Sequence, residues 1–474
     1  MLARLLLLMA LSAPVFAAVP ADRPNILWIL ADDLGPELGC YGYPLVKTPH
    51  LDRFAAEGVR YTHAFTTAPV CSSSRSALFT GRYQTAIGAH HHRTVDPQPL
   101  PPDVRTVTDH LRAAGYFTVN VTPSAAIRRA GGRGPDGATG TGKTDFNFTV
   151  AKPFDGTDWK QRAAGQPFFA QLSLAAPHRG PVWAEAKRRA ARIDPAAVSL
   201  PRFTPDHPVA RQDLADYLEA VQLADSDFGD VLARLAREGL ADNTVVIFTS
   251  DNGQCLFRSK QFLYDGGLRV PLLIRWPDRR RAGATDDRLV SGIDLTAAVL
   301  GLAGAPPDPG MHGTDFLRPG AAPRDHVIAA RDRMGLAGDR QRAVRTNRHK
   351  YIRNYFPAIP NLQTNLYKER EYPTWNVFKE LAAAGRLTPE QQPFAAATKP
   401  VEELYDVVAD PDEVRNLAAD PAQAAVLADL RGKLDAWLAA YPDGGRIGEE
   451  PLDVLRINRA YMESTRAPRP AARP

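Results

Sequence analysis

The stretch Asn25-Ile-Leu-Trp-Ile-Leu-Ala31 decides the fold class of this chain. It is a continuous apolar run of strand length, and it ends directly in the two carboxylates Asp32 and Asp33. A run that is apolar on both faces is typical of a strand buried inside a parallel sheet. Two later stretches have the same form, Phe168-Phe-Ala-Gln-Leu-Ser-Leu174 and Thr244-Val-Val-Ile-Phe-Thr249. The sequence therefore predicts a central sheet built from such strands.

Helical segments lie between these strands. The clearest runs from Asp213 to Glu238, where apolar residues recur at helical spacing. Strands that alternate with helices indicate an α/β layer structure. From about residue 341 the pattern changes to a hairpin, a strand at Glu403–Asp406 and a helix. We therefore expect an α/β domain over residues 22–340 and a smaller C-terminal α+β lobe with a flexible tail over residues 341–474.

Length, composition and charge limit the class of protein. The chain has 474 residues, more than the roughly 250–300 at which a single core stops growing, which also favours two lobes. With 58 Lys+Arg against 53 Asp+Glu, the net charge is +5 and the pI about 9.0. This bias is too mild for a nucleic-acid binder but is compatible with an anionic substrate.

The first residues predict export. Arg4 precedes an apolar run from Leu5 to Phe16, and small residues offer a cleavage site after Ala17, which is the pattern of a secretory signal peptide over residues 1–17. The alternative is a membrane anchor, but the run is short for ~30 Å of hydrocarbon. We expect a mature protein that is periplasmic or secreted, with no membrane segment after cleavage.

Three cysteines are too few for a disulfide framework. Cys40 follows Asp33 by seven residues and Cys255 follows Asn252 by three, so both leave the same region on neighbouring loops. Two arrangements remain open for them: a disulfide in an oxidising compartment, or two unpaired, buried thiols.

Oxygen donors follow two of the predicted strands. Asp32 and Asp33 end the first, and Asp251 and Asn252 follow the strand that ends at Thr249. Open α/β sheets place their ligands at the carboxyl ends of strands. Helix caps and turns also produce such pairs, but an all-oxygen set without His or Cys favours Ca²⁺, with Mg²⁺ as the alternative, over zinc.

The segment Ala68-Pro-Val-Cys-Ser-Ser-Ser-Arg-Ser-Ala-Leu-Phe-Thr-Gly-Arg82 contains the strongest functional signal. Cys71 opens a predicted helix, and Arg75 follows one turn later on the same face. A helix N-terminus and a fixed positive charge both lower the pKa of a thiol and attract anions. Taken alone, the pattern also fits a buried cysteine followed by capping serines.

This segment resembles the motif of the type I sulfatases of the alkaline-phosphatase superfamily, in which the cysteine of Cys-x-Pro-Ser-Arg is oxidised to Cα-formylglycine. The resemblance extends over nearly the whole chain after the leader. It includes Asn25–Gly35, Lys47–Asp52, Thr249–Gly253, Lys260–Pro271 and the C-terminal stretch Glu403–Leu417. It implies an alkaline-phosphatase-like fold, with a large mixed sheet flanked by helices and a smaller C-terminal lobe.

The resemblance also implies a role for each site residue. Asp32, Asp33, Asp251 and Asn252 would hold Ca²⁺, and the formylglycine made from Cys71 would also touch the metal. Arg75 would steady the hydrated aldehyde, Lys143 and Lys260 would grip the sulfuryl group, and His178 would protonate the leaving oxygen or nitrogen. One hydroxyl of the hydrated aldehyde would attack sulfur, and loss of a proton from the other would expel sulfate.

The chain departs from the family pattern at two positions. Ser73 stands where the family usually has proline, so either the formylglycine-generating oxidase or a radical-type maturase is the expected partner. Asp145 stands where the family has the histidine of Gly-Lys-x-His, which assists the elimination of sulfate. His90, His91 and His92 are candidates to replace that base, or they belong to a solvated loop.

The sequence thus predicts an exported sulfatase that acts on sulfate esters or sulfamates of a sulfated, glycosaminoglycan-type carbohydrate, with resemblance to the heparan N-sulfatase branch. Two alternatives remain. One is a phosphodiesterase or phosphonate monoester hydrolase of the same superfamily that uses Cys71 unmodified. The other is an inactive protein that binds sulfated glycans.

Overall fold

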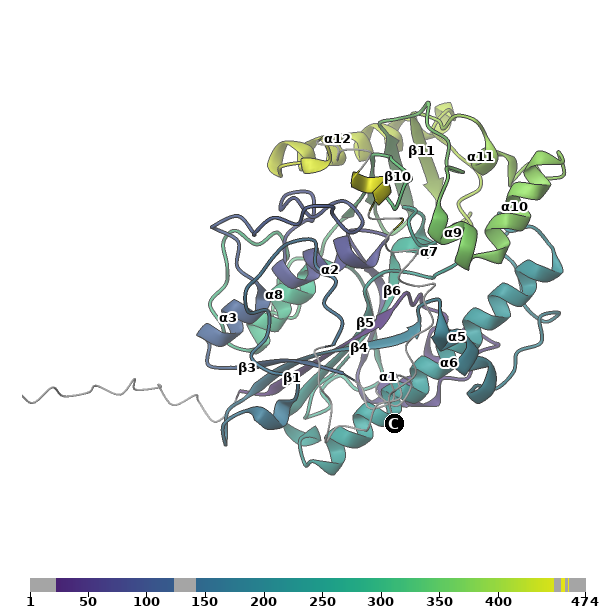
Figure 1. Cartoon of the computed structure of the whole chain (residues 1–474). Helices are drawn as coiled ribbons and strands as arrows, with labels where there is room; N and C mark the ends of the chain where they lie inside the picture. Colours follow the sequence, from purple (N-terminus) through teal and green to yellow (C-terminus); the bar gives the residue numbers. More distant parts are fainter. Residues whose placement is uncertain (1–22, 123–141, 447–452, 457–458, 460–474) are drawn as a thin grey trace, which may run out of the picture.

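The computed structural model describes residues 23–122, 142–446, 453–456 and 459. Its centre is a seven-stranded sheet with the strand order β3-β4-β1-β5-β6-β2-β7, flanked by helices on both faces (Figure 1). The predicted signal peptide and residues 123–141 lie outside the described residues. The strands of this sheet are β1 (Asn25–Asp32), β2 (Val59–Phe65), β3 (Phe117–Val121), β4 (Phe168–Pro177), β5 (Thr244–Ser250), β6 (Arg269–Arg275) and β7 (Ala284–Ser291).

The sheet is mixed, as the resemblance implied. β1 pairs in parallel with β4 and β5, whereas β6 is antiparallel to both of its neighbours, β5 and β2. Because β2 therefore runs in the same direction as β1, β4 and β5, the carboxyl ends of these four strands lie at one edge. This edge carries the residues discussed below.

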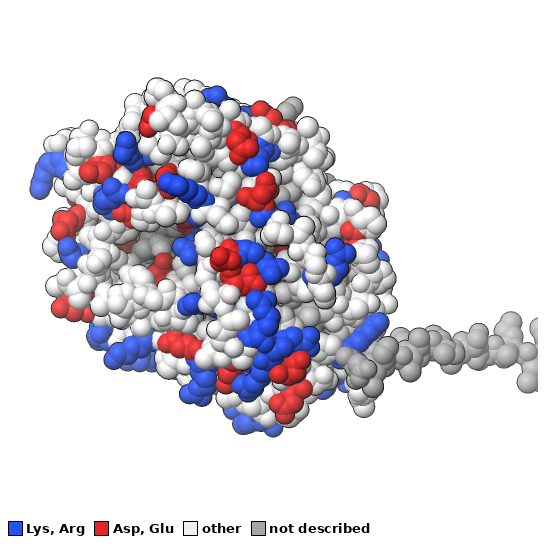
Figure 2. Space-filling model, turned by 180° about the vertical axis from the view of Figure 1, so that it is seen from behind, with Lys and Arg blue, Asp and Glu red and all other residues white. Residues whose placement is uncertain are grey.

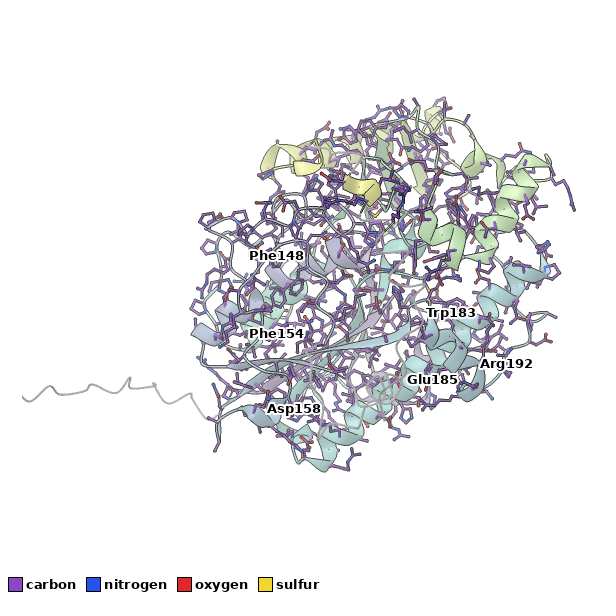
Figure 3. All side chains as sticks on the ribbon, viewed as in Figure 1. Phe148, Phe154, Asp158, Trp183, Glu185 and Arg192 are labelled. Atoms are coloured by element: carbon purple, nitrogen blue, oxygen red, sulfur yellow. The ribbon has the colours of Figure 1, made fainter. Side chains whose placement is uncertain are left out.

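Two apolar layers explain why the central strands are apolar on both faces. In β1, Leu27 and Ile29 pack into one buried cluster, and Ile26 and Trp28 pack into the other. The first cluster is covered by α1 (Pro49–Glu57), α5 (Pro181–Arg189) and α6 (Pro208–Arg237), and the second by α2 (Cys71–Thr80), α3 (Val107–Ala113) and α8 (Gly292–Leu302). Figure 3 shows the division: Phe148 and Phe154 lie on the α2 side, whereas Trp183 lies on the α5 side.

The long helix starts earlier than predicted. α6 begins at Pro208 instead of Asp213, and His207 caps it by accepting a hydrogen bond from the backbone N–H of Val209. A proline at the first helical position costs no intrahelical hydrogen bond, because the N–H there has no partner in a helix. The first turn lacks the apolar spacing of the rest of α6, which is why the sequence pattern did not include it.

The smaller lobe contains an antiparallel sheet of four strands in the order β11-β10-β9-β8. These are β8 (Val327–Arg331), β9 (Gln341–Arg345), β10 (His349–Asn354) and β11 (Glu402–Asp406). The predicted hairpin and final strand are therefore present, and β8 joins them from before residue 341. The helices of this lobe follow β10 in the chain: α9 (Leu366–Glu371), α10 (Pro373–Ala383), α11 (Gln392–Ala395) and α12 (Ala424–Ala440). In the large domain, the short helix α7 (Asp265–Leu268) precedes β6.

The small lobe is packed onto the large sheet domain by a shared apolar cluster. Tyr83, which follows α2, packs edge-to-face against Trp437 of α12, with 5.2 Å between the ring centroids. Figure 1 shows α12 lying above α2 and beside the strands β10 and β11 of the small sheet.

Surface charges on the face shown in Figure 2 are intermixed: Lys and Arg lie beside Asp and Glu. Within the described part of the chain, no helix combines the length and apolarity needed to cross a membrane.

Candidate active site

The oxygen donors meet because β1 and β5 are neighbours in parallel register, with Ala31 opposite Ser250. Asp33 adopts a left-handed backbone (φ 72°), and its N–H donates to the Asp251 side chain at 3.2 Å. The amide of Asn252 donates to Asp33 Oδ1 at 2.9 Å. Asp32, Asp33, Asp251 and Asn252 are all buried. The structure therefore brings the predicted donor set together at the carboxyl edge of the sheet.

Cys71 is the first residue of α2, as expected, and its side chain is fully buried. Its Sγ lies within 4.8 Å of carboxylate oxygens of Asp32 and Asp251. The prediction of a lowered thiol pKa was wrong. Burial raises the pKa of Cys71 to about 11, because desolvation of the thiolate outweighs the attraction of Lys143 and Lys260.

Arg75 lies one turn after Cys71 on α2 and is also buried. Its Nε donates to Asp251 Oδ2 at 2.7 Å, and its Nη1 donates to the hydroxyl of Ser173 on β4 at 2.9 Å. Arg75 thus fixes α2 against the middle of β4 and the residue that follows β5.

Two lysines approach the carboxylates from loops. Lys143 Nζ lies 3.0 and 2.8 Å from the two oxygens of Asp32, and Lys260 Nζ lies 2.7 Å from Asp33. Burial lowers the pKa of Lys143, but the Asp32 carboxylate more than compensates and holds it above its usual range. The Asp33 carboxylate likewise holds the pKa of Lys260 above its usual range, so both ammonium groups are charged in the site.

His178 directly follows β4. Its Nδ1 lies 2.8 Å from the carbonyl oxygen of Arg179 and must donate to it, since a carbonyl only accepts. This leaves Nε2, 3.9 Å from Asp33 Oδ2, available to the site. Burial and the charge of Lys260 lower the pKa of His178.

The donor set suits a hard divalent cation. Asn252 Oδ1 is buried and has no hydrogen-bond partner among the described residues, which is costly unless a ligand satisfies it. Burial raises the pKa of Asp251 to about 7, against the lowering effect of Arg75. Clustered, buried carboxylates with an unsatisfied amide oxygen are the chemistry that Ca²⁺ or Mg²⁺ requires.

His90 and His91, which follow α2, do not lie in a solvated loop, and His92 is half-buried. His90 and His91 are buried, and the Ser73 hydroxyl donates to their carbonyl oxygens at 3.1 and 3.2 Å. Ser73 therefore ties this loop to the first turn of α2, which a proline at this position could not do.

Sequence reasoning missed Tyr367 on α9. Its ring centroid lies 6.4 Å from that of His178, and Lys260 Nζ lies 5.5 Å from the same ring. No sequence pattern marks this tyrosine, because the small lobe carries it to the site from a distant part of the chain.

Cys40 and Cys255 are both free, so the unpaired arrangement holds. Cys255 is buried, with its Sγ 3.3 Å from the carbonyl oxygen of Pro177, whereas Cys40 is half-buried.

Residues 24–305 match the family model described as Sulfatase. The chain belongs to the sulfatase family. It is 32% identical to an ulvan-active sulfatase of Formosa agariphila over 94% of this chain and 79% of that protein. It is 29% identical to human N-sulphoglucosamine sulphohydrolase over 89% of this chain and 93% of the relative. This sulfatase is therefore a hydrolytic enzyme of the family that the motif around Cys71 indicated.

Solved structures agree on the fold. The phosphonate monoester hydrolase of Agrobacterium radiobacter superposes with a TM-score of 0.64 at 19% identity, covering 88% of the sulfatase and 96% of that chain. At this identity the likeness shows the shared fold, which confirms the predicted mixed α/β architecture.

Proposed function

We propose that this sulfatase removes sulfate from a sulfated carbohydrate, either as a sulfate ester or as a sulfamate. One observation carries the proposal: two lysines, an arginine and a histidine converge with a buried oxygen-donor set around Cys71. Such a site can bind and neutralise a transferring sulfuryl group. The names of the relatives, an ulvan-active sulfatase and an N-sulphoglucosamine sulphohydrolase, support a sulfated glycan as the substrate.

The nucleophile requires modification of Cys71. A formylglycine made from it by an oxidase or a radical-type maturase supplies, as its hydrate, a hydroxyl for attack and a second hydroxyl for release of sulfate. When bound by Asp32, Asp33, Asp251 and Asn252, Ca²⁺ (or Mg²⁺) supplies positive charge beside the reacting oxygens. The binding of the sulfuryl group and the proton transfer to the leaving group are tasks of the protein's own side chains.

Lys143 and Lys260 are placed to bind sulfuryl oxygens, since each already holds one carboxylate of the donor set. His178 gives a proton to the leaving oxygen or nitrogen through Nε2. A bound sulfate group brings negative charge close to this imidazole, which favours its protonated form. The ion pair of Arg75 with Asp251 holds the first turn of α2, and with it residue 71, in place beside the donor set.

The alternative chemistry is an unmodified Cys71 that attacks phosphorus, as a phosphonate or phosphodiester hydrolase. Its nucleophile would be the thiolate, and burial raises the pKa of this thiol to about 11. The site therefore disfavours that alternative. The intact cluster of charged groups likewise disfavours an inactive glycan-binding protein.

Export by a signal peptide over residues 1–17 is part of the proposal. So is the division into a catalytic domain over residues 22–340 and a C-terminal subdomain over residues 341–474, with β8 (Val327–Arg331) of the first range adding a strand to the sheet of the second. Export accords with an enzyme that meets extracellular glycans.

The test is sulfate release, measured by ion chromatography, from a panel of sulfated oligosaccharides with Ca²⁺ or with chelator. Protein co-expressed with a maturase should release sulfate, and its Cys71 peptide should have the mass of an aldehyde and react with a hydrazide. Cys71→Ala should release none. Faster turnover of phosphodiesters by protein with an intact Cys71 thiol would favour the alternative, and glycan binding without any release would favour the inactive protein.

A further inference from the structure

The family's elimination step uses a histidine that this chain lacks, and the segments that contain Asp145 and His92 are hydrogen-bonded to each other and to α2. Asp145 stands two residues after Lys143, in the family position of that histidine. It has a left-handed backbone (φ 53°), which is uncommon for a residue other than glycine and is sustained only by its surroundings. The sharp turn keeps Asp145 beside Lys143, with 3.6 Å between Oδ2 and Nζ.

Only one of the two carboxylate oxygens of Asp145 has a hydrogen-bond partner among the described residues. Its Oδ1 lies 3.4 Å from Arg93 Nε. Its Oδ2 is buried and accepts no hydrogen bond from the described residues. Asp145, like Asp251, acts on the Cys71 thiol through space, and the two carboxylates with oxygens within 4.8 Å of Cys71 Sγ are already bound, Asp251 by Arg75 and Asp32 by Lys143. Asp145 thus offers a buried carboxylate oxygen, Oδ2, for proton transfer, while Lys143 and Arg93 lower its pKa.

Hydrogen bonds join the segment that contains His92 to the segment that contains Asp145. Asn147, two residues after Asp145, donates through Nδ2 to the carbonyl oxygens of Ala89 and His91, at 2.9 and 2.6 Å. Its Oδ1 accepts from the N–H of Thr94 at 3.1 Å. The segments that contain Asp145 and His92 are therefore joined on both sides of His92.

The first turn of α2 completes this arrangement. Ser72 Oγ accepts from the N–H of Arg93 at 2.9 Å, and Ser73 holds the two carbonyls that precede His92. The N–H of His92 donates to the carbonyl oxygen of Arg333 at 2.9 Å. The His92 Nε2 is buried and has no hydrogen-bond partner among the described residues. Burial lowers the pKa of His92, and the positive charges of Arg93, Lys260 and Arg333 lower it further, against the opposite effect of Asp145. The neutral, proton-accepting form of the imidazole is therefore favoured.

We propose that Asp145 and His92 act as a pair that replaces the missing histidine as the base of the elimination step. The inference rests on the proposed formylglycine chemistry. After attack, residue 71 carries sulfate on one oxygen and a hydrogen on the other. The pair takes the proton of this hydroxyl, the O–H electrons form the C=O bond, and the C–O bond to sulfate breaks, so that sulfate leaves with its electron pair.

The test uses matured wild-type protein and the variants Asp145→Asn, His92→Gln and the double variant. Quenched reactions are analysed by the mass of the peptide that contains residue 71, alongside the burst of leaving group and the thermal midpoint. Each single variant should retain the first-turnover burst, lose about 10²–10⁴-fold in steady turnover and accumulate peptide carrying sulfate. Because the two residues act as a unit, the double variant should lose little more than either single variant.

A rescue separates the base from a merely structural ion pair. Asp145→His restores the family's residue, and turnover should then become insensitive to His92→Gln. Variants that fold but slow the burst and the steady rate equally, without sulfated peptide, would overturn the proposal, as would additive losses in the double variant. Failure of the proposed function looks different: wild-type protein with an aldehyde at residue 71 would then release no sulfate.

Discussion

Arg75 on α2 and Asp251 at the end of β5 form a buried ion pair, with 2.7 Å between Nε and Oδ2 and side chains that are 1% and 0% exposed. The pair joins the helix that carries Cys71 to the strand end that carries half of the donor set. It couples the structure of the site to its proposed metal.

Asp251→Ala should therefore abolish turnover and metal binding, and it should also lower stability. The substitution removes the ion-pair partner of the buried Arg75, and breaking a buried pair typically costs about 3–5 kcal/mol. Elemental analysis and denaturant unfolding check both effects. The control is Asp278→Ala, which removes an exposed partner of Arg280 and should change neither. A variant that retains full activity and its Ca²⁺ would contradict the donor set.

His178→Ala should impair substrates with poor leaving groups most. A sugar sulfate needs a proton on the departing oxygen, so its rate should fall by about 10²–10⁴-fold, whereas an activated aryl sulfate should lose much less. The measurement is kcat on both substrates, with His326→Ala, a change at a more peripheral histidine paired with Asp325, as the control. Equal losses on the two substrates would remove His178 from the role of general acid.

Ser73→Pro should have two opposite effects. In a host that has only the oxidase, the proline should raise the fraction of Cys71 that becomes formylglycine. Ser73 lies in the first turn of α2, where a missing N–H breaks no intrahelical bond, so the helix should form. The variant nevertheless loses the hydroxyl that holds the carbonyls of His90 and His91.

Turnover per modified site should consequently fall in Ser73→Pro, and stability should drop by about 1 kcal/mol. The aldehyde fraction, counted by mass, normalises the rate. Ser73→Ala is the matched control, since it removes the hydroxyl without adding the ring. If Ser73→Ala turned over like the wild type at equal aldehyde content, the hydroxyl would have no role in positioning the loop.

The surroundings of His312 predict that the free energy of unfolding decreases in acid. Its pKa is lowered to about 4 by burial and by Arg82, and its Nδ1 accepts the backbone N–H of Tyr83 at 3.0 Å. An unfolded histidine has a pKa of about 6.5, so the unfolded chain binds the proton first. This contribution to the free energy of unfolding is therefore present above about pH 6.5 and is lost as the pH falls toward 4.

The expected loss is about 1–2 kcal/mol, because the ring is half-buried and solvent screens part of the effect. Denaturant unfolding across this pH range measures it. His312→Asn keeps an acceptor near Nδ1 but cannot titrate, so its stability should show a smaller slope. Identical slopes in the two proteins would refute the assignment.

The sequence alone determined the fold class and the main catalytic cluster. A strand that is apolar on both faces, such as Asn25–Ala31, is stable only when both faces are buried. Parallel neighbours then place the polar side chains that follow each strand at one edge of the sheet. The motif around Cys71 then identified the family, because its residues are adjacent in the chain and can be read without knowledge of the fold.

Only the tertiary structure decided the protonation of Cys71, the contact between Ser73 and the histidine loop, and the approach of Tyr367 and His92 to the site. Desolvation depends on everything that surrounds a group, so helix position alone gave the wrong direction for the thiol pKa. Ser73 and the histidines it holds are separated by many residues, and Asp145 and Tyr367 lie still further along the chain. Local pattern carries no information about such contacts, which arise when packing brings distant segments together.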